Sequence, residues 1–86
     1  MSEIDELRSE IAGIDAEIVA LVGKRIAVAK EIGAYKRENG LPVIVPDVEA
    51  KVRNRYVEEA RKAGVPEDAA ERIADILITA CRSVQE

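Results

Sequence analysis

The chain has no histidine, phenylalanine or tryptophan, and its 86 residues include only two tyrosines and one cysteine. A single cysteine cannot form a disulfide within the chain, and the absence of histidine removes the most common metal ligand. Without a base beside a serine or cysteine, hydrolytic and acyl-transfer chemistry lack their usual nucleophile. We therefore expect a site that uses neither a metal nor a cofactor.

Charge and hydropathy restrict the partners of the protein. The net charge is -4, whereas binding to nucleic-acid phosphates requires an excess of basic residues. The two tyrosines offer little surface on which bases could stack, so we predict no nucleic-acid partner. No apolar run is long enough to cross a bilayer, and residues 1–6 are acidic and amphipathic, unlike a signal peptide. We expect a soluble, cytoplasmic protein with no membrane partner.

The most informative stretch begins at Ile4 and ends at Tyr35. Apolar residues recur there at alternating spacings of three and four, which is typical of one face of a long helix. No proline interrupts the stretch, and its glycines lie off this face. A helix over residues 3–38 would be about 50 Å long. Its predicted apolar face consists of Ile4, Leu7, Ile11, Ile14, Ile18, Leu21, Arg25, Val28, Ile32 and Tyr35.

The rest of the chain predicts two shorter helices. Asn39-Gly40 ends the first helix, and a connector containing two prolines follows it. Asp47 is expected to cap a second helix that ends at Ala63-Gly64, and Pro66 is expected at the first position of a third helix. No segment alternates with period two over the length of a strand. The prediction is an all-α fold with one domain, residues 1–86, and three helices, the first far longer than the others.

The length of the first helix predicts an intertwined homodimer. A compact domain of this size has a radius of gyration of about 12 Å, so a helix of about 50 Å extends beyond its own globule. Its apolar face then needs a second chain to cover it, and oligomerisation is a common way to stabilise so short a chain. Two copies can pair antiparallel about a midpoint near residue 19 or 20.

Arg25 is the one charged residue on the predicted apolar face. A buried guanidinium without an anion costs several kcal/mol, so it must meet a negative group or reach water. A structural alternative is that Arg25 only fixes the register of a coiled coil. Lys36 points within about 20° of the same direction and lies about 16 Å along the axis, which leaves space for a small anion. By itself, Lys36 is more typical of a solvated cation at a helix end.

Arg8 lies about 25 Å from Arg25 along the helix, too far to share a site within one chain. In the antiparallel pair, the partner's Arg8 comes opposite residues 30–32, between Arg25 and Lys36. A cationic pocket across the dimer interface is therefore geometrically available. Taken alone, Arg8 is typical of an ordinary surface charge.

Three polar residues of the later helices have ordinary structural interpretations when each is considered alone. Glu49 lies at the start of the second helix, where the helix dipole favours an acid. Cys81 is typical of a small buried hydrophobe, and Gln85, next to last, of a frayed polar end. Cys81 and Gln85 are four residues apart and share one face of the third helix.

Taken together, these residues resemble the all-helical chorismate mutase family, of the small intertwined-dimer type. The resemblance covers nearly the whole chain, and the key residues appear at the family's spacing without insertion. The matching segments are Leu7-Arg8, Ile14-Asp15, Lys24-Arg25, Gly33-Ala34-Tyr35-Lys36, Leu41-Pro42-Val43, Glu49 and Gln85.

The resemblance implies a homodimer with two identical sites that convert chorismate to prephenate, a step of aromatic amino acid biosynthesis. It implies that Arg25 and the partner's Arg8 hold the carboxylates of the substrate. Lys36 would bind a carboxylate and the ether oxygen, and Glu49 would accept a hydrogen bond from the ring hydroxyl. Gln85 would donate to the ether oxygen, and Cys81 falls where the family often has a small polar residue near a carboxylate.

Two positions depart from the family pattern, which is similar to Asp-Pro-x-Arg-Glu. Val45 replaces the aspartate, which matters little if the family uses the backbone there, and Val48 replaces the arginine, a cation that helps to hold a carboxylate. Lys51 is a candidate for a partial replacement. Val48 keeps two related activities open, isochorismate pyruvate-lyase and aminodeoxychorismate mutase. A non-catalytic helical dimerisation module is the alternative from another class.

Overall fold

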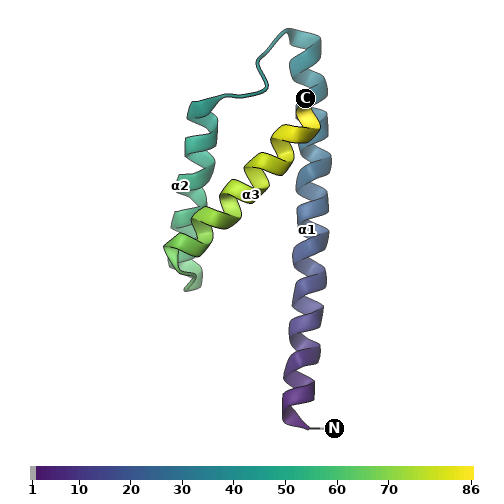
Figure 1. The fold of residues 1–86 in the computed structure, drawn as a ribbon, viewed down its shortest axis with the longest axis vertical. Coiled ribbons are helices and arrows are strands. Elements are labelled where there is room, and N and C mark those ends of the chain that lie inside the picture. Colours follow the sequence, from purple (N-terminus) through teal and green to yellow (C-terminus); the bar gives the residue numbers. More distant parts are fainter. Residues whose placement is uncertain (1) are drawn as a thin grey trace.

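The computed structural model describes residues 2–86 and consists of three helices: α1 (Glu3–Asn39), α2 (Pro46–Ala63) and α3 (Glu67–Gln85) (Figure 1). None of the described residues lies in a strand, so the predicted all-α class is confirmed. None of the helices combines the length and apolar composition needed to cross a membrane, within the same residues.

Both predicted ends of α1 are confirmed. The Ser2 hydroxyl accepts a hydrogen bond from the Asp5 backbone N–H, 3.3 Å away, and acidic residues fill the first turn, where the helix dipole favours them. At the other end, Gly40 adopts the left-handed conformation (φ 63°), and the Leu41 N–H donates to the Lys36 carbonyl. A residue without a Cβ takes this conformation without strain, which explains why the helix stops here.

The start of α2 differs by two residues from the prediction, and the start of α3 by one. Asp47 does not cap α2; Val45 is the N-cap residue, without a side-chain hydrogen bond, and Pro46 occupies the first helical turn. Proline has no N–H to satisfy and its φ suits a helix, so the helix starts at Pro46, two positions earlier than predicted. Pro66, expected inside α3, is its N-cap residue.

The third helix crosses between the other two and packs against both, whereas in the described chain no Cα atom of α1 lies within 8 Å of a Cα atom of α2 (Figure 1). Small side chains allow this close approach, and the buried core is correspondingly small. It consists of Ala29, Ala60, Ala70, Ala74, Leu77, Ile78 and Cys81. The connector and the crossing of α3 hold α1 and α2 apart, and this spacing creates the site described below.

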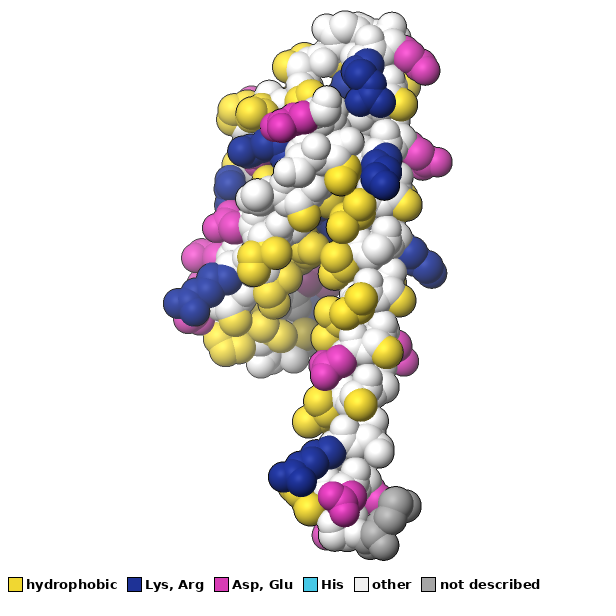
Figure 2. Space-filling view, turned by 45° about the vertical axis from the view of Figure 1, so that its right-hand side comes forward, with side chains coloured by type: hydrophobic (Ala, Val, Ile, Leu, Met, Phe, Trp, Pro, Cys, Tyr) yellow, Lys and Arg dark blue, Asp and Glu magenta, His cyan; other side chains and the backbone are white. Residues whose placement is uncertain are grey.

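The first half of α1 projects beyond the other helices as an exposed, partly apolar rod (Figures 1 and 2). The chain measures 57 × 23 × 15 Å with a radius of gyration of 16.2 Å, well above the compact value of about 12 Å. Ile11 and Ile14 are exposed by 58% and 54%. The prediction that the helix outruns its globule is therefore confirmed, whereas the homodimer stays a prediction.

Candidate active site

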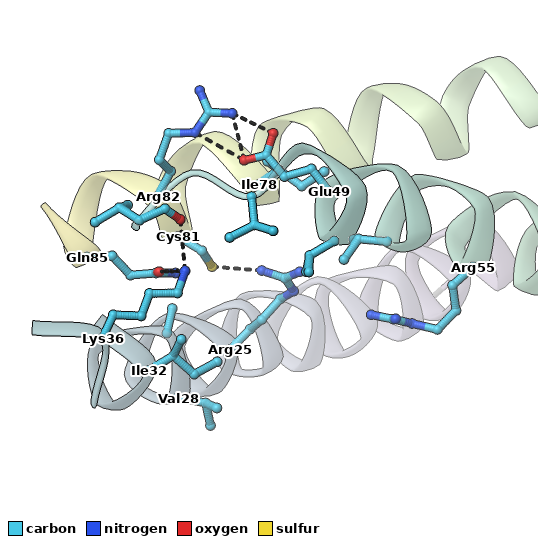
Figure 3. A pocket seen from close by; sticks show the side chains of 15 residues that line it. Arg25, Val28, Ile32, Lys36, Glu49, Arg55, Ile78, Cys81, Arg82 and Gln85 are labelled. Carbon is cyan, nitrogen blue, oxygen red and sulfur yellow. Dashed lines mark hydrogen bonds and ion pairs between the residues drawn. The ribbon is translucent and has the colours of Figure 1, made fainter. Parts of the chain in front are cut away.

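A cavity of about 390 Å³ lies where the C-terminal half of α1, the N-terminal half of α2 and the end of α3 face one another (Figure 3). This volume lies in the lower part of the range of small-molecule sites. The lining combines an apolar wall with several charged groups: Arg25, Val28, Ala29, Ile32, Lys36, Val43, Val45, Val48, Glu49, Val52, Arg55, Ile78, Cys81, Arg82 and Gln85.

Arg25 enters the cavity from α1 and meets Cys81 of α3. Its Nη1 donates to the Cys81 Sγ across 2.8 Å, and Cys81 is 4% exposed. A thiol is a weak, neutral acceptor, so the charge of the guanidinium remains uncompensated by this contact. Since a guanidinium carries five N–H donors, most remain available to a ligand.

Lys36 lines the same cavity as Arg25, and hydrogen bonds anchor it to both the connector and α3. Its Nζ donates to the Val43 carbonyl at 2.8 Å and to the Gln85 Oε1 at 2.7 Å. An ammonium has three donors, so one stays free. The predicted common direction of Arg25 and Lys36 is confirmed, because both line the same cavity.

The bond from Lys36 also fixes the amide of Gln85. Lysine can only donate, so the atom facing it must be the amide oxygen, and the NH₂ group is left to donate elsewhere. The Gln85 backbone is held too, because Arg37 Nη1 donates to its carbonyl at 3.2 Å. Gln85 is therefore positioned on two sides instead of fraying, although it is the last residue of α3.

Close packing at Gly33 brings Gln85 to this place. A Cβ added at Gly33 would lie 2.9 Å from the Gln85 Cα, so a larger residue would force the backbones of α1 and α3 apart. Gly33 is buried in α1, one turn before Lys36. Its small size therefore sets the distance between Lys36 and Gln85.

Glu49 is held by Arg82, a residue that the sequence did not single out. Arg82 Nη2 donates to both Glu49 carboxylate oxygens at 2.6 and 2.7 Å, and Nε donates at 3.2 Å. This hydrogen bond raises the pKa of the Arg82 guanidinium further above its already high ordinary value, so it stays cationic. Glu49 is the one acidic residue of the cavity lining, and the pair joins α2 to α3 beside it.

Val48 and Val45 both line the cavity, and Lys51, the expected replacement for the missing cation, does not. Arg55 lines it instead. Residues 48 and 55 are seven apart, about two helical turns, and so share one face of α2, whereas residue 51 is turned away from it by about 60°. Spacing alone could have identified Arg55.

Arg8 lies outside this cavity, near the free end of α1. Its side chain is 73% exposed and its Nη1 is 3.9 Å from an Asp5 carboxylate oxygen. One chain thus brings together five of the six predicted site residues, namely Arg25, Lys36, Glu49, Cys81 and Gln85. Their roles toward a ligand stay predictions, and Arg8 can join them only from a second chain.

The cavity is rich in donors and poor in acceptors. Four cationic side chains and one carboxylate line it, which gives a net charge of +3 (4 − 1) from a chain whose overall charge is -4. Such a site favours a small, oxygen-rich anion over a neutral or cationic molecule.

Residues 7–86 match the family described as chorismate mutase type II. The chain belongs to that family. In this chorismate mutase type II chain, the match covers all of α1 after its first turn, the whole of α2 and α3, and every cavity-lining residue named above.

Several relatives of this family member carry informative names. It is 35% identical over 89 residues to a bifunctional chorismate mutase/prephenate dehydratase of Aquifex aeolicus, covering 100% of this chain and 25% of that protein. It is 48% identical over 56 residues to an intracellular chorismate mutase of Mycobacterium tuberculosis, covering 65% of this chain and 53% of the relative. A 4-amino-4-deoxychorismate mutase of Streptomyces venezuelae is 27% identical over 85 residues, with 99% and 82% covered.

A conserved hypothetical protein of Pyrococcus furiosus has the same fold, with a TM-score of 0.80, 28% identity and coverage of 100% and 99% of the two chains. The first curated relatives are much longer proteins, of which this chorismate mutase type II chain spans 19%, 25% and 20%.

Proposed function

We propose that this protein is a chorismate mutase, an isomerase that converts chorismate to prephenate in aromatic amino acid biosynthesis. The observation that carries the proposal is the convergence of Arg25, Lys36 and Gln85 on one cavity, each with donors to spare. Chorismate is a small dianion with an ether oxygen and a ring hydroxyl. Its two carboxylates complement the net positive charge of the cavity.

The reaction is an intramolecular pericyclic rearrangement, which needs no nucleophile, general base, metal or cofactor. Cations that hold both carboxylates select the compact conformer in which the bond-forming carbons approach. As the carbon–oxygen bond breaks, negative charge grows on the ether oxygen. Fixed donors stabilise that charge more than they stabilise the ground state, and removing one such donor typically costs about 3 to 4 kcal/mol.

Each side chain then has a distinct role. Arg25 holds a carboxylate, and the one free N–H of Lys36 is shared between a carboxylate and the ether oxygen in a bifurcated hydrogen bond. The free NH₂ of Gln85 donates to the same ether oxygen. Glu49, with two oxygens and about four acceptor sites, keeps capacity for the ring hydroxyl beside its bonds to Arg82. Cys81 orients Arg25 through its thiol.

The proposed enzyme is a homodimer in which the partner's Arg8 completes each site. The exposed apolar residues of α1 support this arrangement, because they include Ile4, Leu7, Ile11, Ile14 and Ile18 along the half of the helix that projects freely. Antiparallel pairing covers this face and carries a guanidinium to the open side of the other cavity. We also place the protein in the cytoplasm, an assignment supported by the name of the intracellular Mycobacterium relative.

An assay of chorismate consumption, with size-exclusion chromatography of the same sample, tests the proposal. Arg25→Ala should lower turnover by at least about a hundredfold, since it removes a charged donor, and should leave the dimer intact. Lys24→Ala is the matched control, because Lys24 is adjacent but does not line the cavity. Altered oligomeric state without any wild-type turnover would instead support a helical dimerisation module.

The second candidate is 4-amino-4-deoxychorismate mutase. The named Streptomyces relative, aligned over nearly the whole of this chain, favours it, and Val48 removes a cation that the family usually has. The two substrates differ at the ring position that Glu49 would face, where a carboxylate accepts from either a hydroxyl or an amine. Comparing kcat/KM for both substrates under the same conditions decides between them.

A further inference from the structure

Among the four cations of the cavity, three are held by neighbouring groups of the described chain. Arg25 donates to Cys81, Lys36 to Val43 and Gln85, and Arg82 to Glu49. Within residues 2–86, Arg55 alone among these cations forms neither a hydrogen bond nor an ion pair.

Arg55 lies on the same helix as Val48, the residue that replaces the arginine of the family pattern. Both residues line the cavity, and seven residues of helix place them on one face of α2 with Val52 between them. Valine is short, so residue 48 does not fill the space that a long side chain there would take. In Figure 3 the Arg55 side chain extends from α2 toward the part of the cavity that holds Arg25.

We propose that Arg55 binds a carboxylate of the substrate and replaces, from two turns further along α2, the cation missing at position 48. This proposal rests on the proposed function and deepens it. Arg82 cannot take this role as readily, because its Nε and Nη2 are committed to Glu49 at 2.6 to 3.2 Å. Moving Arg82 onto a ligand would leave that carboxylate unpaired beside an anion.

The replacement alters what the site selects. A guanidinium that reaches the ligand from position 55 approaches along the length of α2, while one at position 48 would approach from directly beside Glu49. Arg55 therefore favours a substrate whose carboxylate lies toward Arg25 and away from Glu49. It contributes to binding of the anion, and it leaves the ether oxygen to Lys36 and Gln85.

The experiment is steady-state kinetics of purified full-length variants with chorismate. Arg55→Ala should raise KM by about ten- to a hundredfold and change kcat little, because a carboxylate contact present in both ground and transition states affects binding uniformly. Arg55→Lys should recover part of the loss. Arg53→Ala is the matched control: Arg53 lies on the same helix but binds Asp75 at 2.7 Å outside the cavity, and its KM should equal that of the wild type.

A rescue variant tests the replacement itself. Val48→Arg introduced into the Arg55→Ala background should restore KM to within about threefold of the wild type, since a guanidinium again reaches the same anion. An active wild type with Arg55→Ala unchanged in KM overturns the role of Arg55 and leaves the proposed function intact. A wild type that neither converts nor binds chorismate, measured by calorimetry, overturns the proposed function and this role with it.

Discussion

At the scale of single residues, the chemistry of the site depends on which hydrogen-bond donors are already bonded to other residues of the chain and which remain free. The amide of Gln85 is oriented by Lys36, so that its oxygen is occupied and its NH₂ is free. An amide donates without any protonation step. Hence we expect the rate to stay nearly constant between neutral and mildly alkaline pH.

Gln85→Glu should convert this flat profile into an acid-dependent one. A carboxyl group donates to the ether oxygen only when protonated, so turnover at neutral pH should fall by about a hundredfold or more. It should rise again as the pH approaches the carboxyl range near about 4 to 5. A pH profile of kcat for the wild type and the variant measures this, with circular dichroism at each pH to verify folding. A variant as active as the wild type at neutral pH would remove Gln85 from the mechanism.

Among the elements, the crossing of α1 and α3 controls the geometry of the donors. Gly33→Ala should push the end of α3 away, because the new Cβ would meet the Gln85 backbone at 2.9 Å. We expect turnover to fall at least about tenfold although alanine is the better helix former. Gly23→Ala is the control, since no atom lies within 4 Å of a Cβ at that position. Equal turnover of the two variants would show that the close approach does not position Gln85.

Local signals made the helix boundaries predictable. Gly40 and Gly64, both with positive φ, end α1 and α2 at the expected places, because a C-terminal glycine acts within one turn of the helix. The start of α2 was predicted less accurately. Asp47 and Pro46 both favour the start of a helix, and the helix begins at the proline.

Contacts between helices were only partly predictable. Arg25 and Lys36 were predicted to share a direction because one helix carries both, and Arg55 follows Val48 by the same rule. The pair of Glu49 and Arg82 spans 33 residues and depends on the angle at which α3 crosses α2, which no spacing in the sequence specifies.

For the molecule as a whole, the proposed intertwined dimer predicts a result that a site within one chain does not. Arg8→Ala and Arg25→Ala should each be inactive as homodimers, since every site lacks one guanidinium. Refolding an equal mixture should restore about a quarter of the wild-type activity, because half of the dimers are mixed and each has one intact site. Chorismate turnover before and after mixing measures the recovery. Persistent inactivity of mixed dimers, verified by native mass spectrometry, would contradict a site shared between subunits.

The small side chains of the core affect the stability of the folded protein. The described core buries only four alanines, Leu77, Ile78 and Cys81. Because so small a core offsets little chain entropy, we expect folding and pairing of the proposed homodimer to be one bimolecular event. Thermal midpoints should then climb with protein concentration. Cellular abundance, as much as sequence, would set the fraction of chains that are folded and competent.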